Sequence, residues 1–198
     1  MRFCIPFQTQ TDWTAVPAVE LTHCGWTPES PIRAQGQLSC DGGALHVRMT
    51  AAEQPIRATL SGKLDQVCTD SCLEFFFAPR VDDDRYFNFE WNRLGALSLS
   101  FGTLRATRIR LVPKDAIAQF AFRSFQTEDG WGVEYEIPLD FLRVFYPDYA
   151  FTGDAAGNFY KCGDETEFPH FLSWAPMSSD TPDFHRRGDF GALHFEEG

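Results

Sequence analysis

The chain has 198 residues, of which 17 are basic and 28 acidic, giving a formal net charge of −11. This length suits one domain over residues 1–198 with a sizeable core. A hydrophobic content of 43% with 23% charged residues argues against a disordered chain. The acidic balance disfavours a nucleic-acid partner, because phosphate neutralisation needs clustered lysine and arginine. No apolar run reaches the about 18 residues that a membrane-spanning helix needs, so no membrane partner is expected.

The N-terminus and the cysteines bear on the cellular compartment. Residues 1–8 lack the apolar run of roughly 7–15 residues that marks a secretory signal. A cytoplasmic location is therefore favoured, and export after removal of a leader stays open. Six cysteines in 198 residues are too sparse for a disulfide-dependent scaffold, so we expect most of them to be reduced. Cys68 and Cys72 match neither a redox pair nor a usual zinc pair in their spacing.

Short strand signals recur along the chain. Apolar and polar residues alternate from 45 to 49, which predicts a strand. A β-rich run at 72–77 and an alternating run at 86–92 flank an aspartate-rich turn, and together they predict a hairpin. Further strands are predicted at 96–101, 116–122, 131–137, 172–174 and 191–195.

Helix signals are few by comparison. Residues 139–145 follow Pro138 and predict one or two helical turns. The 20 phenylalanines against 3 methionines also favour β structure. The predicted fold is an all-β, antiparallel β-sandwich of the jelly-roll type, with one or two short helices and less than about a fifth of its residues in helix.

The run 86–92 has two different faces. Phe87, Phe89 and Trp91 point to one side of the strand, and the residues between them are polar or tyrosine. We expect the apolar side to face the core, together with the apolar positions of two other runs. The residues expected to be buried are Phe75, Phe77, Phe87, Phe89, Val133, Tyr135 and Ile137.

Several short motifs follow one another in a specific order. They are D-S-x-x-E-F-F at 70–76, Y-F-x-F-E-x-N-x-x-G at 86–95, G-W-x-x-E-x-x-I-P at 130–138, and a terminal series with W-x-P at 174–176, P-x-F-H at 182–185 and F-G-x-L-x-F at 190–195. This series resembles the carbohydrate-binding module family 9-like domains, and the resemblance covers about residues 30–195.

The resemblance implies a sandwich of two antiparallel sheets with a sugar held against one polar, concave sheet face. It also implies bound calcium, an association with xylanases and similar hydrolases in polysaccharide breakdown, and a grip on the sugar between two tryptophans. Trp174 matches one of those two, whereas the loop at 62–69, which should supply the other, contains no aromatic residue. Glu74 matches the acidic residue that bonds sugar hydroxyls in the family.

The chemistry of these residues supports a sugar site independently. A sugar offers paired hydroxyls and a weakly apolar ring face, so its site needs a flat aromatic and short polar side chains. We expect Trp174 to stack on the ring, four polar residues to bond the hydroxyls, and three residues from two loops to form the rim. The polar residues are Glu74, Asn88, Glu90 and Asn92, and the rim residues are Tyr160, Lys161 and His185.

Each of these residues also has a structural interpretation. Trp174 could be a core tryptophan, and Glu74 could be a buried carboxylate that needs a partner inside a phenylalanine-rich strand. Glu90 and Asn92 could lie on a solvated strand or turn, and His185 could anchor its loop. The sequence leaves these alternatives open.

A structural calcium is the one metal for which the sequence offers candidates. Calcium prefers oxygen ligands, and Asp82, Asp84 and Asp164 are the carboxylates that could supply them. A plain charged turn also explains the aspartates at 82–84. The cysteine and histidine spacings match no usual zinc pattern.

The leading functional hypothesis is non-catalytic binding of a mono- or oligosaccharide. The main alternative is a protein-interaction or structural sandwich with a decayed sugar site. A glycoside hydrolase using Glu74 and Glu90 would need carboxyls about 5–9 Å apart. A haem-binding sandwich is disfavoured because His46 and Met49, three apart on a strand, point to opposite faces. The sequence does not identify the sugar or the oligomeric state.

Overall fold

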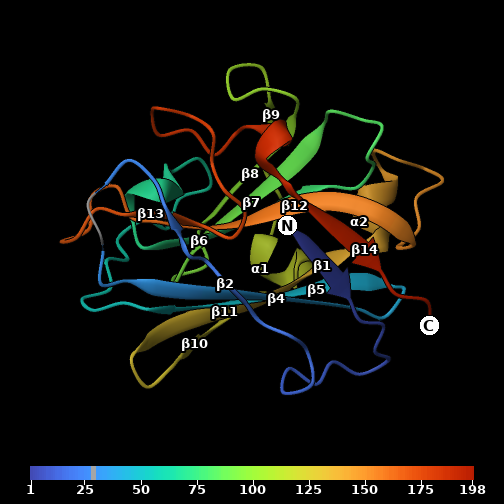
Figure 1. Ribbon diagram of the computed structural model, residues 1–198, viewed down its shortest axis with the longest axis horizontal. Helices are drawn as coiled ribbons and strands as arrows, with labels where there is room; N and C mark the ends of the chain where they lie inside the picture. The colour runs from blue at the N-terminus through green and yellow to red at the C-terminus, as the bar shows by residue number, and fades with distance from the viewer. Residues whose placement is uncertain (28–29) are drawn as a thin grey trace.

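The computed structural model describes residues 1–27 and 30–198 and consists of two packed β-sheets (Figure 1). About 40% of the residues are in strands and 8% in helices, which confirms the predicted sandwich. The larger sheet, as described, has the order β1-β14-β12-β6-β7-β8-β9, with β13 and β3 attached beside β12. Its strands are β1 (Arg2–Ile5), β3 (His23–Cys24), β6 (Cys72–Ala78), β7 (Tyr86–Asn92), β8 (Leu97–Gly102), β9 (Ile109–Leu111), β12 (Gly153–Cys162), β13 (Phe171–Ser173) and β14 (Gly191–Phe195).

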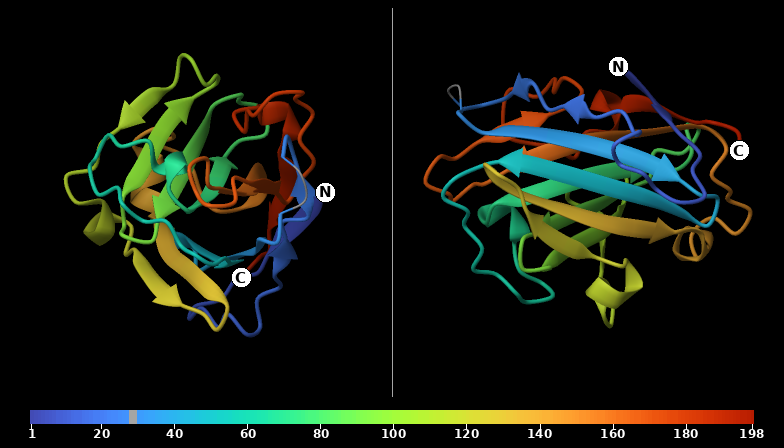
Figure 2. Two further views of the ribbon diagram at one scale, coloured as in Figure 1. Left: turned by 90° about the vertical axis from the view of Figure 1, so that its left-hand side faces the viewer. Right: turned by 90° about the horizontal axis from the view of Figure 1, so that it is seen from below.

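The smaller sheet has the order β10-β11-β5-β4-β2. Its strands are β2 (Val19–Glu20), β4 (Arg33–Cys40), β5 (Ala44–Ala52), β10 (Arg123–Gln126) and β11 (Gly130–Pro138). Figure 2 shows the two sheets face to face, with the loops gathered around their edges. Among the strands of the described residues, every pairing is antiparallel except that of β1 with β14, which is parallel.

The core lies between the sheets and is rich in aromatic rings. On β7, Phe87, Phe89 and Trp91 all face this core and are fully buried, as the alternation predicts. Phe87 stacks on Phe101 of β8 with ring centroids 4.5 Å apart. All seven residues expected in the core are buried, which confirms the assignment of the apolar faces.

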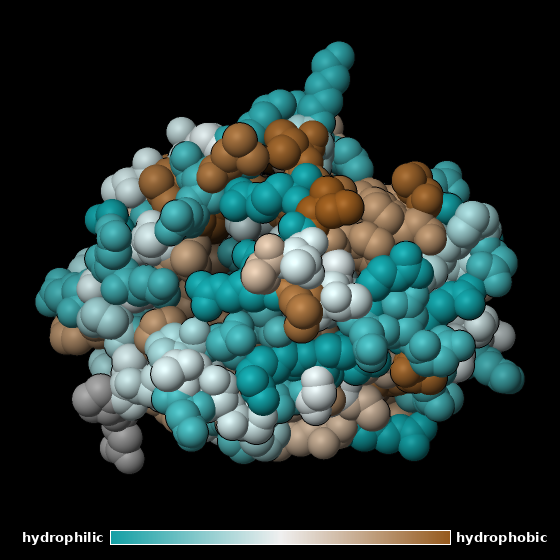
Figure 3. Space-filling model, turned by 90° about the horizontal axis from the view of Figure 1, so that it is seen from above, coloured by the Kyte–Doolittle hydropathy of each residue, from teal (hydrophilic) through white to brown (hydrophobic). Residues whose placement is uncertain are grey.

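The outer face of the large sheet is polar but is not open to solvent. Segments after β13 fold back over it, so that Phe184 stacks on Tyr160 at 4.1 Å and His185 lies 4.8 Å from the ring of Phe76. Figure 3 shows this side of the molecule from above, with a largely hydrophilic surface broken by separate hydrophobic groups. Polar residues on this sheet face are therefore buried beneath a loop layer.

Two segments differ from the sequence prediction. Residues 116–122 are not a strand: α1 (Ala116–Gln119) begins at Asp115, whose carboxylate accepts a hydrogen bond from the Ala118 amide, and β10 follows it. The segment at 158–164, expected to be a loop, is mainly the C-terminal half of β12, between β6 and β13. The polar residues of this segment suggested a loop, but their side chains form hydrogen bonds and an ion pair inside the protein.

The predicted helical turns after Pro138 are present as α2 (Leu139–Arg143). Short 3₁₀ turns occur at η1 (Val67–Thr69) and η2 (Arg187–Asp189). Within the described residues, no helix has the length and apolar character needed to cross a membrane.

Candidate functional site

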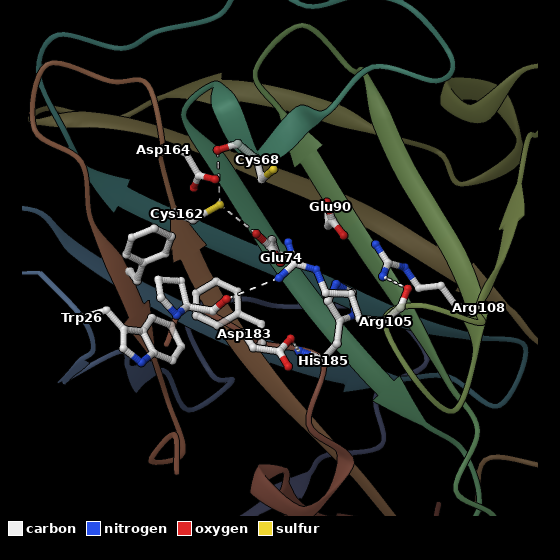
Figure 4. Close-up of a pocket in the computed structure, with 13 residues that line it drawn as sticks. Trp26, Cys68, Glu74, Glu90, Arg105, Arg108, Cys162, Asp164, Asp183 and His185 are labelled. Atoms are coloured by element: carbon white, nitrogen blue, oxygen red, sulfur yellow. Dashed lines mark hydrogen bonds between the residues drawn. The ribbon is translucent and has the colours of Figure 1, made fainter. Parts of the chain in front are cut away.

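A pocket lies on the outer face of the large sheet, where the loop layer leaves a gap. Its volume is about 510 Å³, a figure that includes the part open to solvent. The pocket is lined by Trp26, Cys68, Glu74, Glu90, Arg105, Arg108, Cys162, Asp164, Phe171, Pro182, Asp183, Phe184 and His185. Figure 4 shows Trp26 on one side, Glu90 and Arg108 on the other, and Glu74 between them.

Two carboxyl groups form the floor of the pocket. Glu74 on β6 and Glu90 on β7 are directly opposite each other in the antiparallel register. Burial raises the pKa of Glu74 well above its ordinary value, and the facing Glu90 raises it further. Burial likewise raises the pKa of Glu90, against the opposing effect of Arg108. Two such carboxyls do not readily carry two charges, so the floor can donate as well as accept hydrogen bonds.

The turn between β8 and β9 supplies two guanidinium groups. Arg108 donates from Nε to Ser100 Oγ at 2.8 Å and from Nη1 to the Arg105 carbonyl at 2.6 Å. Arg105 donates to the Pro182 carbonyl at 3.3 Å, which ties this turn to the loop layer. The guanidinium orientations are therefore fixed before a ligand arrives.

The opposite side of the pocket is aromatic. Trp26 packs edge-on against Phe171, with ring centroids 5.6 Å apart, and lies 5.7 Å from Phe184. Its indole N–H donates to the Ser179 carbonyl at 2.7 Å. Trp26 also has a φ of 61°, a left-handed conformation that costs a residue other than glycine about 1–2 kcal/mol. The contacts of Trp26 hold the ring at the pocket despite this cost.

His185 completes the wall below Glu74. Its Nδ1 lies 3.1 Å from the hydroxyl of Tyr86. Burial, then Arg108 and Arg105, lower the pKa of His185 to about 3, so its ring is neutral at ordinary pH. The contacts around His185 are thus those of a neutral hydrogen-bonding group rather than a cation.

Cys68 and Cys162 line the upper end of the pocket, and Cys72 is buried beside Cys162. Cys72 and Cys162 are directly opposite on β6 and β12, and Cys162 donates to Glu74 Oε1 at 2.8 Å. Burial raises the pKa of Cys72 to about 12. Cys4, Cys40, Cys68, Cys72 and Cys162 form no disulfide in the structure, and the expectation that most cysteines are reduced stays a prediction.

Three of the eight residues expected to bind sugar lie in this pocket: Glu74, Glu90 and His185. The prediction for Trp174 needs correction, because its side chain is 5% exposed and packs in the core between Phe3 and Phe159. Gly191 lies against its ring. A ring enclosed in this way has no face on which a sugar can stack.

Lys161 is not a rim residue either. Side chains alternate along β12, so Lys161 points to the interior between the sheets while Tyr160 and Cys162 face outward. Its ammonium group lies 3.1 Å from Glu53 and 2.8 Å from His170 Nε2, and it is fully buried.

The remaining predicted residues support the site from beneath. Asn88 donates to Glu90 Oε1 at 2.6 Å and is fully buried, so it positions Glu90. Tyr160 donates to the Phe184 carbonyl at 3.3 Å under the loop layer. Asn92, at the end of β7, donates a hydrogen bond to the carboxylate of Asp70. It accepts hydrogen bonds from the backbone amides of Leu94 and Ala96, so it stabilises the turn that follows the strand.

The proposed calcium ligands do not converge. Asp82 and Asp84 lie in the turn after β6 and line a shallow hollow with Arg80 and Arg85. Asp164 lies in the pocket near the start of β6, whereas Asp82 and Asp84 follow its end. Because β6 has seven residues, the two groups of carboxylates are about 20 Å apart. Side chains this far apart cannot bind one ion, so these residues do not fit a shared calcium site.

Sequence reasoning missed Trp26, Arg105, Arg108 and Phe171. These residues come from loops and a strand edge, where no periodic pattern marks a side chain as facing a pocket. The signal that could have drawn attention to the arginines is the basic stretch at 91–123, which holds five arginines, one lysine and one aspartate.

Known proteins resemble this chain in sequence and in fold. The family model for carbohydrate-binding family 9 matches residues 7–195. A candidate carbohydrate-binding protein from Bacteroides uniformis ATCC 8492 is 26% identical, with a TM-score of 0.84 over 98% of this chain and 99% of that chain. A family 9 module from Caldicellulosiruptor kristjanssonii, solved with cellotriose, is 13% identical with a TM-score of 0.68 over 99% of this chain and 94% of that one. A family 9 module from the same organism, solved with glucose, is also 13% identical, with a TM-score of 0.68 over 99% of this chain and 96% of that one. No curated protein matches the chain.

Proposed function

The chain belongs to carbohydrate-binding family 9, and we propose that the pocket over Glu74 and Glu90 is the site where it binds a mono- or oligosaccharide. The observation that carries this assignment is the division of the pocket into an aromatic side and a polar side (Figure 4). A sugar ring has the same division, with C–H groups on its faces and hydroxyls at its edge.

The aromatic side offers Trp26, with Phe171 and Phe184 packed around it. The indole ring supplies a flat apolar surface that its bond to Ser179 holds in place. A preorganised ring loses little conformational entropy when it receives a ligand. Trp26 therefore takes the stacking role that the sequence assigned to Trp174.

The polar side supplies donors and acceptors at fixed positions. Arg108 and Arg105 donate, and His185 can do either. The carboxyls of Glu74 and Glu90 accept, and either of them can also donate when it is protonated, which their raised pKa values favour. Paired donors and acceptors match the vicinal hydroxyls of a sugar. The hydrogen bond that Asn88 donates to Glu90 and the one that Arg108 donates to Ser100 keep these groups in place.

The module is non-catalytic in this proposal. The floor carboxyls lie side by side on adjacent strands of one sheet rather than on opposite sides of a bound sugar, and glycoside hydrolysis needs two carboxyls that flank the scissile bond. A role in polysaccharide breakdown would then come from a partner hydrolase. The absence of aryl-glycoside turnover by a preparation that binds sugar is the expected result.

Calorimetric titration with glucose and cellotriose tests the proposal. After the entropy cost of binding, one stacking contact and a few hydrogen bonds leave a Kd on the order of micromolar to millimolar. Trp26→Ala and Glu90→Gln should each weaken binding at least about 10-fold, or about 1.4 kcal/mol. Thermal melting of both variants shows whether they remain folded.

Trp13→Ala is the matched control. Trp13 is also a half-buried tryptophan, but it lies near Arg48 of the small sheet and away from the pocket. Its loss should leave sugar affinity unchanged. Equal losses in Trp13→Ala and Trp26→Ala, or no loss in folded Trp26→Ala, would place the sugar elsewhere.

A further inference from the structure

Three potential metal ligands converge at the upper end of the pocket. The Sγ atoms of Cys72 and Cys162 and a carboxylate oxygen of Glu74 all lie within 4.8 Å of one another. All three residues are at most 2% exposed. A tetrahedral zinc site with bonds of about 2.0–2.3 Å separates its ligand atoms by about 3–4 Å, so small side-chain adjustments suffice for all three atoms to reach one ion.

Strand geometry explains this convergence. Cys72 and Glu74 are two residues apart on β6, so their side chains point to the same face. Cys162 is the direct neighbour of Cys72 on β12 and points to that face too. The ligands are brought together by strand pairing across about 90 residues of sequence, which is why no short zinc motif announces them.

The carboxyl group of Glu74 has few partners inside the protein that would compete with a bound ion. Within the described part of the chain, its carboxylate accepts one side-chain hydrogen bond, from the Cys162 thiol, and forms no ion pair with lysine or arginine. A buried carboxylate is costly unless paired or bound to a metal. A thiol is a weak donor and compensates little of that cost.

We propose that Cys72, Glu74 and Cys162 form a binding site for a thiophilic divalent ion of the zinc class. Thiolate sulfur selects zinc over calcium or magnesium. As the two metal–sulfur bonds form, the two thiol S–H bonds break, and Glu74 gives up its proton where it carries one. All of these protons pass to solvent. The metal keeps its oxidation state, and two thiolates with one carboxylate give the loaded centre a charge of −1.

The site is open on one side. Glu74 and Cys162 line the pocket, together with Cys68 and Asp164. Three protein ligands leave one position of a tetrahedral ion free, and here that position faces the pocket. Because the ion would bind the carboxylate of Glu74, that carboxylate could no longer form the hydrogen bonds that we assign to it in sugar binding. The metal site rests on the geometry of β6 and β12 alone and does not depend on sugar binding.

Cobalt(II) titration of the reduced full-length chain tests this inference without any sugar. Tetrahedral cobalt thiolate sites show intense visible d–d bands and a sulfur-to-cobalt charge-transfer band. We expect both bands to saturate at one cobalt per chain and to disappear when zinc is added. Cys162→Ser should abolish the charge-transfer intensity or reduce it by at least half. Glu74→Gln should weaken cobalt affinity at least about 10-fold.

Cys4→Ser is the matched control, because Cys4 is an exposed cysteine on β1, and it should bind cobalt as the wild type does. Circular dichroism identifies a variant that fails to fold, and Glu74→Gln, which is nearly isosteric, serves if a serine variant does. The inference is overturned if the cobalt bands survive in folded Cys162→Ser, or if Cys4→Ser loses as much band intensity as Cys162→Ser does. It is also overturned if no thiolate band appears in the wild type, or if a Cys72–Cys162 disulfide persists in the reduced protein.

Discussion

A few charged side chains of this protein are buried and are stabilised by specific partners. Lys161 shows it most clearly, since its ammonium group is fully buried and bonds Glu53, His170 and the Cys162 carbonyl. Glu53 in turn accepts hydrogen bonds from Trp131 Nε1 at 2.9 Å and from Ser71 Oγ at 2.8 Å. The cluster joins β12, β11 and the segment after β5 across the sandwich.

Replacing Lys161 with methionine should be strongly destabilising. The change keeps the apolar stem but leaves the Glu53 carboxylate buried without its cation, and loss of one partner of a buried pair costs about 3–5 kcal/mol. Urea unfolding of Lys161→Met measures this loss. The double variant Lys161→Met/Glu53→Gln removes both charges and should recover part of the stability. A loss below about 1 kcal/mol in the single variant would show that the pair is not buried.

His170 predicts how stability changes with pH. Burial, then the neighbouring Lys161, lower the pKa of His170 from 6.5 to about 4. Because this pKa is depressed in the folded state, the unfolded chain binds the proton first as the pH falls below 6.5, and stability is lost until about pH 4. The facing Glu53 also has a lowered pKa: burial raises it, but Lys161 and hydrogen bonds from Trp131 and Ser71 outweigh burial. Protonation of Glu53 therefore reduces the stability further only at a lower pH than the protonation of His170 does.

Chemical unfolding from pH 7.5 to pH 4 measures this dependence. The free energy of unfolding should fall as the pH drops through 6.5, and His170→Gln should reduce this fall and leave the part that comes from His185, whose pKa is also lowered. If folded His170→Gln keeps the full pH dependence of the wild type, the pKa of His170 is not lowered in the folded protein.

At the scale of elements, strand periodicity predicted the positions that alternate between core and outer face. The runs at 86–92 and 131–137 correspond to β7 and β11, and the turns after Pro138 correspond to α2. Period 2 fixes which side chains share a face, so the core residues and the shared face of Glu74 and Glu90 followed from sequence alone.

The same reasoning failed at β12 for a physical reason. Asn158 and Lys161 make the segment look like a loop, yet Asn158 bonds both backbone groups of Ala175, and Lys161 pairs with Glu53. These partners are distant in sequence, so local patterns cannot reveal that the polar groups are satisfied. The pocket residues Trp26, Arg105 and Arg108 were missed for a related reason, since the packing of loops decides where they point.

Trp174, next to the end of β13, provides a test of the corrected site. It packs edge-on against Phe3 and Phe159 in the core. Trp174→Ala should therefore destabilise the fold by about 3–5 kcal/mol, through lost burial and a residual cavity. Thermal or urea unfolding measures this loss. A stable Trp174→Ala variant that no longer binds sugar would restore Trp174 to the binding site and contradict its core position.

At the scale of the whole molecule, the sandwich separates stability from binding. The aromatic core between the sheets stabilises the fold, while the outer face of the large sheet, covered by loops, carries the pocket. Such a rigid scaffold with a loop-built site is typical of binding proteins. Substitutions in the pocket should consequently alter sugar affinity more than they alter unfolding.

The five tryptophans of the chain allow the most direct test of the central claim. Each gives an indole N–H signal in a ¹⁵N–¹H correlation spectrum, and titration with glucose or cellotriose shows which signal responds. We predict that the Trp26 signal shifts in proportion to occupancy, while those of Trp13, Trp91, Trp131 and Trp174 change little. Saturable binding that shifts the Trp13 signal and leaves Trp26 unmoved, or no binding at millimolar sugar, would contradict the assignment of this pocket as the carbohydrate site.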